Sequence, residues 1–319
     1  MKRFKNILVV ADGESGATHS LLSTSIDLAR RNRASLTLFS VVESIPERRR
    51  YQKRNGRRLD LVAQMIESRM AELKAMIPHS DVPIHYEVVS GSAHVEVIER
   101  VKRLGHDLVL TVPMPPLRRR SLGSSSTTMH LLRKCPVPVW VHSPLTATAD
   151  AVLVALGPME PTSHDLNIKL LELGSSLART GDSELHVVHG WRLEGEAMIR
   201  SPRMGYSPEE VDAMGDAVRR EAEQEITKLR EAVPGALHAS IILGNGDSAD
   251  VIAAAIDEVN PATVVMGTLA RSGIPGYIIG NTAERVLVEV NRSVLAVKPE
   301  GFVTPIGAID AWHPGQMPY

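Results

Sequence analysis

The sequence predicts an α/β fold made of two tandem doubly wound domains, each with a five-stranded parallel sheet of the Rossmann-like kind. The chain has 319 residues, which exceeds the usual ~100–200 residues of one domain. Short apolar runs alternate with helix-like stretches, the pattern of parallel sheets with crossover helices. This pattern occurs twice, and Leu28-Ala29-Arg30 returns 149 residues later as Leu177-Ala178-Arg179.

Each repeat is expected to contain five strands and the helices that connect them. The first strand of each repeat is a continuous apolar run, which is typical of a strand covered on both faces. Long polar stretches at about 59–76 and 208–231 predict helices between the second and third strands. The expected strands are 7–12, 36–42, 84–89, 108–110 and 137–141, then 152–157, 185–191, 239–243, 264–266 and 294–297.

These elements predict a domain at 1–146, a second domain at 150–300 and an extension at 301–319. Ser, Pro and Thr cluster without periodicity between the two repeats, as in a linker. The extension contains turn residues and has no counterpart in the first repeat. In a doubly wound sheet the ligand crevice lies beyond the carboxyl ends of strands one and four, so function is expected there.

The net charge of −1 hides an asymmetry between the halves. Residues 1–148 carry 23 Lys and Arg against 13 Asp and Glu, a net +10; the remainder carries 13 against 24, a net −11. Opposite charges favour docking of the halves. The alternative is a basic surface for an anionic partner, formed by the runs at 48–50, 53–54, 57–58 and 118–120. These runs lack interleaved aromatic residues, so a solvated helix face is the plainer interpretation, and we do not expect a nucleic-acid partner.

The sequence favours a cytoplasmic protein. No apolar run approaches the ~18–20 residues that span a bilayer, so membrane insertion is not expected. The single cysteine, Cys135, cannot form an internal disulfide, which fits a reducing compartment.

A glycine-bearing segment in the second repeat has the chemistry of a phosphate site. Gly267 ends the fourth strand, and Gly280-Asn281-Thr282 opens a helix whose free amide groups and positive dipole end suit a phosphate. Arg271 is placed to neutralise a terminal phosphate. The alternative is that the glycines only permit turns and that Thr282 is an ordinary N-cap.

The segment from Val264 to Leu287 resembles the nucleotide loop of the universal stress protein family. Gly267 and Gly280 occupy the outer glycine positions of that loop, while Ala270 replaces its middle glycine and Asn281 its Ser or Thr. The following Ala283-Glu284-Arg285-Val286-Leu287 also matches. The resemblance implies a tandem-domain stress-response protein that binds ATP or AMP, with its domains packed as an internal pseudo-dimer through their fifth strands. Further self-association into a homodimer stays open.

Departures from the family pattern reduce the expected affinity. Family members that bind ATP carry an Asp at the end of strand one; the second repeat has Gly157 there, directly after Leu156. The first repeat keeps the acid as Asp12, but Thr111 and Met114 replace its loop glycines. We therefore expect a weak adenine-nucleotide site in the second domain only, around Leu156, Gly267, Ala270, Arg271 and Gly280–Thr282.

No catalytic or metal-binding residues are predicted. The chain lacks the P-loop motif and the Gly-x-Ser-x-Gly elbow. His186 and His189 are three residues apart on a strand, hence on opposite faces, although His189 near the crevice is a candidate ligand contact. Two alternatives remain open: a slow ATP hydrolase or phosphotransferase, and a carrier or scaffold whose degenerate crevices hold an apolar ligand or a protein partner.

Overall fold

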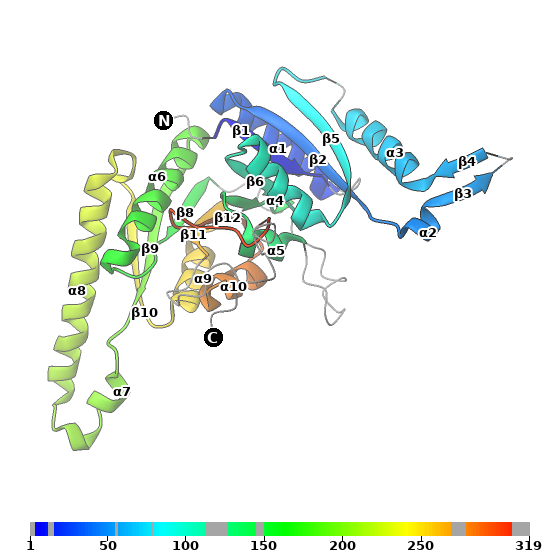
Figure 1. Ribbon diagram of the computed structural model, residues 1–319. Coiled ribbons are helices and arrows are strands. Elements are labelled where there is room, and N and C mark those ends of the chain that lie inside the picture. The colour runs from blue at the N-terminus through cyan, green and yellow to red at the C-terminus, as the bar shows by residue number, and fades with distance from the viewer. Residues whose placement is uncertain are drawn as a thin grey trace. The chain divides into compact units, whose positions relative to one another are not determined.

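The computed structural model describes residues 4–11, 16–54, 57–77, 79–112, 127–144, 150–268 and 279–307. Their contacts divide these residues into two compact units. The first contains the residues up to 144 together with 301–307, and the second contains 150–268 together with 279–300. Figure 1 shows the elements of both units in chain order.

The first unit contains five parallel strands in the order β7-β6-β1-β2-β5. The first and fourth of these along the chain are neighbours, since Ile7 pairs with Leu108, and the sheet is therefore doubly wound as predicted. The strands are β1 (Asn6–Val10), β2 (Ser35–Glu43), β5 (Ile84–Gly91), β6 (Leu108–Thr111) and β7 (Val139–Val141).

Helices cover both faces of this sheet. Leu73 on α3 packs with Val42 and Val88 on one face. On the other face Arg100 of α4 forms an ion pair with Glu87, the strand neighbour of Val88. The helices are α1 (Gly16–Asn32), α2 (Glu47–Arg50), α3 (Leu61–Met76), α4 (Ala93–Leu104) and α5 (Thr127–Lys134).

A two-stranded antiparallel hairpin, β3 (Tyr51–Arg54) with β4 (Arg57–Asp60), leads into α3. The sequence interpretation of this basic stretch as a solvated helix face was wrong here, because only Glu47–Arg50 is helical. The dipeptide Asn55-Gly56 between the strands is a strong hairpin signal in sequence, and it outweighs the helix-like charge pattern.

The second unit repeats the sheet with the order β10-β9-β8-β11-β12. Leu153 pairs with Val264, so strands one and four are again neighbours. The strands are β8 (Ala151–Ala155), β9 (Glu184–Trp191), β10 (Ser240–Asn245), β11 (Thr263–Gly267) and β12 (Ser293–Val297).

Two helix layers cover this sheet as well. Gly174 of α6 lies against Val154 on one face, and Gly190 and Gly244 let α9 approach the other. The helices are α6 (His164–Gly181), α7 (Glu196–Ile199), α8 (Pro208–Ala232), α9 (Ser248–Val259) and α10 (Asn281–Glu289), with 3-10 turns η3 (Pro161–Ser163), η4 (Pro202–Met204) and η5 (Pro234–Ala236). Helix α8 starts at a capping box of Ser207 and Glu210, as the Ser-Pro-Glu-Glu sequence indicates.

Residues 301–307 belong with the first unit. The Lys102 ammonium of α4 donates to the Ile306 carbonyl at 3.1 Å, and Gly307 lies close to the same ammonium. None of the helices in the described ranges has the length and apolar content that a membrane span requires.

Candidate functional site

In a doubly wound sheet the ligand crevice is expected where strands one and four end, which in the second unit are the paired strands β8 and β11. Leu156 follows β8, is buried, and donates its amide to the Val188 carbonyl at 3.0 Å. Gly267 ends β11, and a Cβ there would lie 3.0 Å from Leu166 of α6, so this glycine makes room for that side chain. Of the remaining predicted site residues, Asp12, Ala270 and Arg271 lie outside the described ranges.

Thr268 connects the end of β11 to two other elements. Its amide donates to the Val297 carbonyl at 3.1 Å, and its own carbonyl accepts from the Gly280 amide at 3.0 Å. Its hydroxyl accepts from the Lys298 ammonium at 3.1 Å. The residue after β11 therefore fixes both the start of α10 and the residue that follows β12.

Helix α10 begins beside Thr268, because the amide of its N-cap residue donates to the Thr268 carbonyl. Gly280 is the N-cap, and no side chain in the described ranges caps the helix there. Asn281 is exposed and Thr282 is half-buried in the first turn. The alternative prediction that Thr282 is the N-cap was wrong, because Gly280 precedes the helix in extended geometry and takes that position. An uncapped helix start keeps amide donors available for an anion.

Lys298 is a residue of the site that the sequence analysis missed. It directly follows the apolar run of β12 and is only 4% exposed. The Lys169 ammonium of α6 donates to the Lys298 carbonyl at 3.4 Å. Lysines are almost never fully buried unless paired, so the burial of Lys298 and its bond to Thr268 distinguish it from an ordinary surface lysine. The structure thus places the Lys298 ammonium at the carboxyl end of the sheet.

The loop after β8 is held by an amide rather than by an acid. Asn167 of α6 accepts from the Gly157 amide at 2.9 Å and donates to the Pro158 carbonyl at 3.2 Å. Asn167 is 1% exposed, so these bonds are shielded from water. A Cβ at Gly157 would lie 3.4 Å from Asn167 Oδ1, an ordinary contact. Position 157 therefore has room for a side chain, although this protein has glycine there.

His189 lies beside Leu156 on the face covered by α6. Burial lowers the pKa of its imidazole, and a hydrogen bond to the Leu156 backbone opposes that shift in part. Its Nδ1 atom is buried and has no partner among the described residues. At neutral pH the ring is neutral and offers hydrogen bonding rather than charge. His186 lies on the opposite face and bonds Glu184 at 3.2 Å.

The first unit has a different arrangement at the equivalent place. His142 follows β7, is 6% exposed, and forms a 2.8 Å hydrogen bond with Ser20 of α1. Burial lowers the pKa of His142, so a neutral ring stands where the second unit has the Lys298 ammonium. The loop that would hold a phosphate in this unit, at 113–126, lies outside the described residues.

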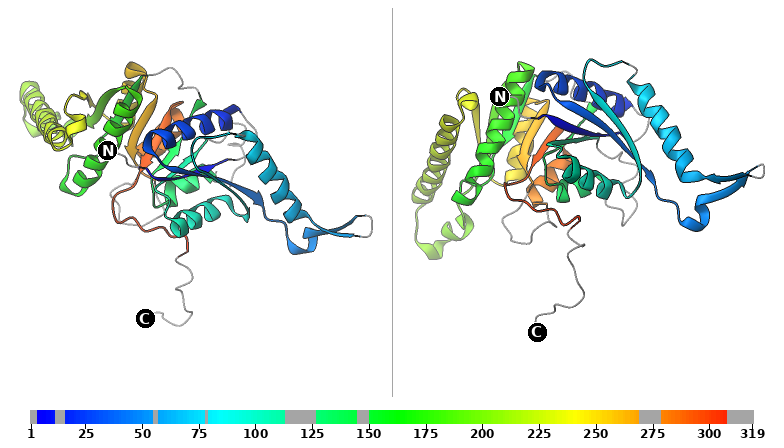
Figure 2. Two further views of the ribbon diagram at one scale, coloured as in Figure 1. Left: turned by 90° about the horizontal axis from the view of Figure 1, so that it is seen from above. Right: turned by 45° about the horizontal axis from the view of Figure 1, so that its top comes forward.

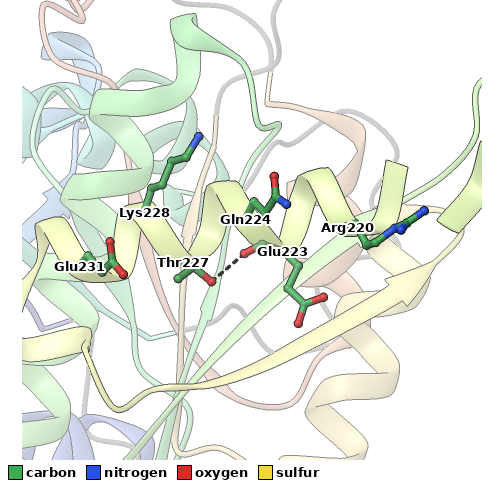
Figure 3. Close-up of a pocket in the computed structure, with 6 residues that line it drawn as sticks. All are labelled: Arg220, Glu223, Gln224, Thr227, Lys228 and Glu231. Carbon is green, nitrogen blue, oxygen red and sulfur yellow. Dashed lines mark hydrogen bonds between the residues drawn. The ribbon is translucent and has the colours of Figure 1, made fainter. Parts of the chain in front are cut away.

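Two surface hollows lie elsewhere on the second unit. One, of roughly 470 Å³, is lined only by residues of α8: Arg220, Glu223, Gln224, Thr227, Lys228 and Glu231 (Figure 3). Cations and carboxylates alternate along this helix face, which is typical of a solvated surface. The other lies beyond β9 and β10 beside α7, next to the exposed Met198. No group of three His, Cys, Asp or Glu in the described parts of the chain is placed to hold a metal ion.

A doubly wound sheet that occurs twice in one chain, each time with strands one and four adjacent, defines a tandem α/β protein of the Rossmann-like class. The model of the universal stress protein family matches residues 3–142 and 150–298. The chain therefore belongs to the universal stress protein family, and both of its repeats are domains of that family.

Curated relatives match this chain over most of its length. Universal stress protein E of Escherichia coli K12 is 31% identical over 234 residues, which cover 72% of each chain. The universal stress protein E homolog of Haemophilus influenzae is 23% identical over 322 residues, which cover 93% of this chain and 98% of that protein. These similarities confirm the predicted tandem type.

Solved structures share the fold over nearly the whole chain. A protein of unknown function from Pseudomonas aeruginosa PAO1 matches with a TM-score of 0.66 at 20% identity, covering 93% of this chain and 94% of its own. A universal stress protein from Archaeoglobus fulgidus matches with a TM-score of 0.61 at 16% identity, covering 92% and 98%. At these identities the likeness establishes the fold.

Proposed function

We propose that this tandem universal stress protein is a non-catalytic, cytoplasmic regulator of the stress response whose second domain binds an adenine nucleotide weakly. The observation that carries the proposal is the group formed by Thr268, Gly280 and Lys298. Thr268 connects the uncapped start of α10 to the buried Lys298 ammonium. Both features favour the negative charge of a phosphate group.

The residue at the end of β8 explains why the affinity is low. Gly157 offers no carboxylate to a ribose hydroxyl, and the buried amide of Asn167 is already bonded to the loop backbone. A nucleotide hydroxyl left without a partner costs about 1–3 kcal/mol, which corresponds to roughly one to two orders of magnitude in affinity. We expect dissociation constants of about 10⁻⁵–10⁻³ M for ATP and AMP.

The described residues around the crevice support binding rather than turnover. Leu156, Gly157, Gly267, Thr268 and Lys298 include no carboxylate, thiol or imidazole that would act as a general base. His189 is nearby, but its imidazole is buried and bonded to the Leu156 backbone. A slow hydrolase would need a base from another part of the chain.

The test is titration of the full chain with a fluorescent ATP analogue, followed by competition with ATP, AMP and adenosine. Gly280 has an extended backbone conformation that any residue can adopt, so Gly280→Trp should be tolerated by the backbone. Its indole ring would fill the space in front of the helix amides, and binding should therefore disappear. Gly16→Trp is the control, because a Cβ at that position would meet no atom within 4 Å. Absence of binding at millimolar nucleotide, or equal loss in both variants, would contradict the proposal.

A second candidate function rests on the connection after β9. Met198 is 63% exposed and Met204 and Tyr206 are also exposed. Exposed methionines suit an apolar ligand or a protein partner. Native mass spectrometry of gently purified protein separates the candidates, because it shows whether a nucleotide, a lipid-like molecule or a protein co-purifies.

A further inference from the structure

Helices α9 and α10 of the second unit begin at the same edge of its sheet, because each follows the carboxyl end of a parallel strand. This is the edge where the nucleotide site is proposed. The two helices pack against each other (Figures 1 and 2), and Arg285 of α10 forms ion pairs with the start of α9. The residue therefore joins the helix proposed to bind phosphate to its neighbour.

The guanidinium of Arg285 bridges two carboxylates at the start of α9. Its Nη1 atom lies 2.9 Å from Asp247 Oδ1, and its Nη2 atom lies 2.6 Å from Asp250 Oδ1. Its Nε atom lies 3.8 Å from Glu289 Oε1 within α10 itself. Exposed ion pairs of this kind contribute little to overall stability. Their effect is local, because two donors of one planar group hold the two helix starts in a fixed relation.

The start of α9 is itself fixed to the sheet. Asp247 is the N-cap of this helix and accepts from the Ala249 amide at 3.0 Å through the same Oδ1 atom that contacts Arg285. A Cβ at Gly190 would lie 3.0 Å from the Ser248 Cα, so at this point no side chain separates α9 from β9. The first turn of α9 is therefore a fixed point against which another helix can be positioned.

Helix α10 depends on such contacts for its position. It has nine residues, and helices shorter than ~12–15 residues are marginal by themselves. The Gly280 amide ties the N-cap to the Thr268 carbonyl, and Ala283 and Val286 are buried. Arg285 adds a polar attachment one turn after the helix start, about 6 Å along the axis. Together with the buried side chains, the two attachments fix the direction in which the amides of the first turn point.

The same ion pairs remove negative charge that would oppose a phosphate. Asp247 and Asp250 place two carboxylates at the edge of the sheet where α10 begins. Without a cation beside them they would repel an anion over about one Debye length, ~10 Å at 0.1 M salt. We propose that Arg285 is a positioning residue of the nucleotide site, which directs the start of α10 and neutralises the acids beside it. The inference rests on the proposed function, since it concerns the phosphate end of the same ligand.

A role limited to stability predicts a different result. If Arg285 only held α10 to the unit, its loss would weaken every ligand of the crevice alike. A positioning role affects the ligands that carry a phosphate, because only these contact the helix start in the proposed site. A comparison of ATP and AMP with adenosine therefore separates the two roles.

The experiment titrates the full chain with ATP, AMP and adenosine in competition with a fluorescent ATP analogue. Arg285→Gln removes both the charge and the bridge, so ATP and AMP should bind about 5-fold more weakly, with adenosine within about twofold of the unaltered chain. Arg285→Lys keeps the charge but loses the planar two-donor geometry, and it should weaken ATP binding by only about twofold.

Arg200→Gln is the matched control, because Arg200 also bridges two carboxylates. Its Nε atom lies 2.7 Å from Glu196 and its Nη2 atom 2.6 Å from Asp212, and its side chain is 41% exposed against 43% for Arg285. These pairs join the end of α7 to α8 and involve no residue of the proposed nucleotide site. The control variant should therefore bind ATP within about twofold of the unaltered chain.

A second substitution tests the electrostatic part of the proposal. Asp250→Asn in the Arg285→Gln background removes one uncompensated carboxylate while Asp247 still caps α9, so ATP should bind about twofold more tightly than to Arg285→Gln alone. Raising the salt to about 0.5 M should reduce the difference between Arg285→Gln and the unaltered chain, because the remaining repulsion is screened. Hydrogen exchange gives a readout without substitution: with ATP bound, the amides at the start of α9 should slow together with those of α10.

Four results overturn the inference. They are equal weakening of ATP and adenosine in Arg285→Gln, unchanged ATP affinity in that variant, an equal loss in Arg200→Gln, and exchange that slows in α10 but not at the start of α9. Failure of the proposed function is distinguishable, because the unaltered chain would then bind no nucleotide even at millimolar concentration. That result would overturn the inference together with the proposed function.

Discussion

The Lys298 ammonium donates a 3.1 Å hydrogen bond to Thr268 Oγ1, and the two residues are only 4% and 1% exposed. Removing a lysine from water is costly, so a fold that retains one in such a place has a compensating interaction or a use for the charge. Thr268 also holds the N-cap of α10 through its carbonyl. One residue therefore positions both positive features of the proposed nucleotide site.

Lys298→Met is expected to weaken ATP binding about 10-fold and adenosine binding hardly at all, because only phosphates contact the ammonium in the proposed site. The free energy of unfolding should change by less than about 1 kcal/mol, since an apolar residue of similar volume needs no desolvation. Lys169→Met, which removes only a donor to the Lys298 carbonyl, is the control. Equal weakening of ATP and adenosine would show that Lys298 is only structural.

Gly157→Asp should restore the missing acceptor. A Cβ at this position meets Asn167 Oδ1 at an ordinary 3.4 Å, so the backbone tolerates the side chain. We expect ATP and AMP to bind about 10- to 100-fold more tightly in calorimetric titrations. Gly157→Asn has nearly the same shape without the charge and should gain far less. If both variants bind like the original chain, the nucleotide does not lie at the end of β8.

His94 and His130 predict an acid-sensitive first unit. Their rings stack with centroids 4.1 Å apart between α4 and α5. Burial, and then the charges of His130 and Lys134, lower the pKa of His94 from 6.5 to about 4. Burial also lowers the pKa of His130, with Lys134 and Arg133 adding to the shift.

Because the folded pKa lies below the unfolded value, the unfolded chain binds protons first as the pH falls. The free energy of unfolding should therefore fall between pH 6.5 and about 4 and level off below that. With solvent screening the loss is about 1–2 kcal/mol. Urea denaturation at several pH values measures it, and His94→Phe, which keeps an aromatic ring but not the titration, should flatten the profile.

The corresponding helices of the second unit are joined differently, which provides an internal comparison. Arg285 of α10 forms ion pairs with Asp247 at 2.9 Å and Asp250 at 2.6 Å at the start of α9. No histidine takes part in these ion pairs. A pH dependence that His94→Phe leaves unchanged would assign the acid sensitivity to other groups.

The fold was predictable because its signals are local and repeated. The apolar runs of β1 and β8 and the recurrence of Leu-Ala-Arg fixed strand positions to within a few residues. The hairpin at 51–60 was missed because its charges carry no apolar alternation, and the Asn55-Gly56 signal was not weighed. Local sequence patterns were therefore enough to predict the strands of the two sheets, but not the β3–β4 hairpin, which has no apolar core of its own.

The site was only partly predictable, since its members come from distant segments. Gly267 and Gly280 were found from their spacing, whereas Lys298 and Asn167 were not singled out. Lys298 reads as an ordinary lysine after a strand until its burial and its bond to Thr268 are known. Asn167 lies within α6, and the apolar pattern of that helix does not indicate that the Asn167 side chain accepts a hydrogen bond from the Gly157 amide.

Gly174 and Gly215 provide a matched test of packing in the second unit, because the same substitution in two helices should act in opposite directions. Alanine favours a helix interior over glycine by about 1 kcal/mol. At Gly215 of α8 a Cβ would meet only Trp191 at 3.8 Å, so Gly215→Ala should stabilise by about that amount. At Gly174 of α6 a Cβ would overlap with Cγ2 of Val154, a fully buried strand residue. Overpacking costs about 1–3 kcal/mol, so Gly174→Ala should destabilise despite its better propensity.

A double-mutant cycle identifies the contact responsible. Val154→Ala alone removes buried methyl groups and should destabilise, but in the Gly174→Ala background it also relieves the clash. The double variant should therefore be at least about 1 kcal/mol more stable than the sum of the single changes predicts. Urea midpoints of the four proteins measure this coupling. Additive effects would mean that α6 moves away from β8 when Gly174 is replaced. The close approach of Gly174 to Val154 would then not be what holds α6 in place against the sheet.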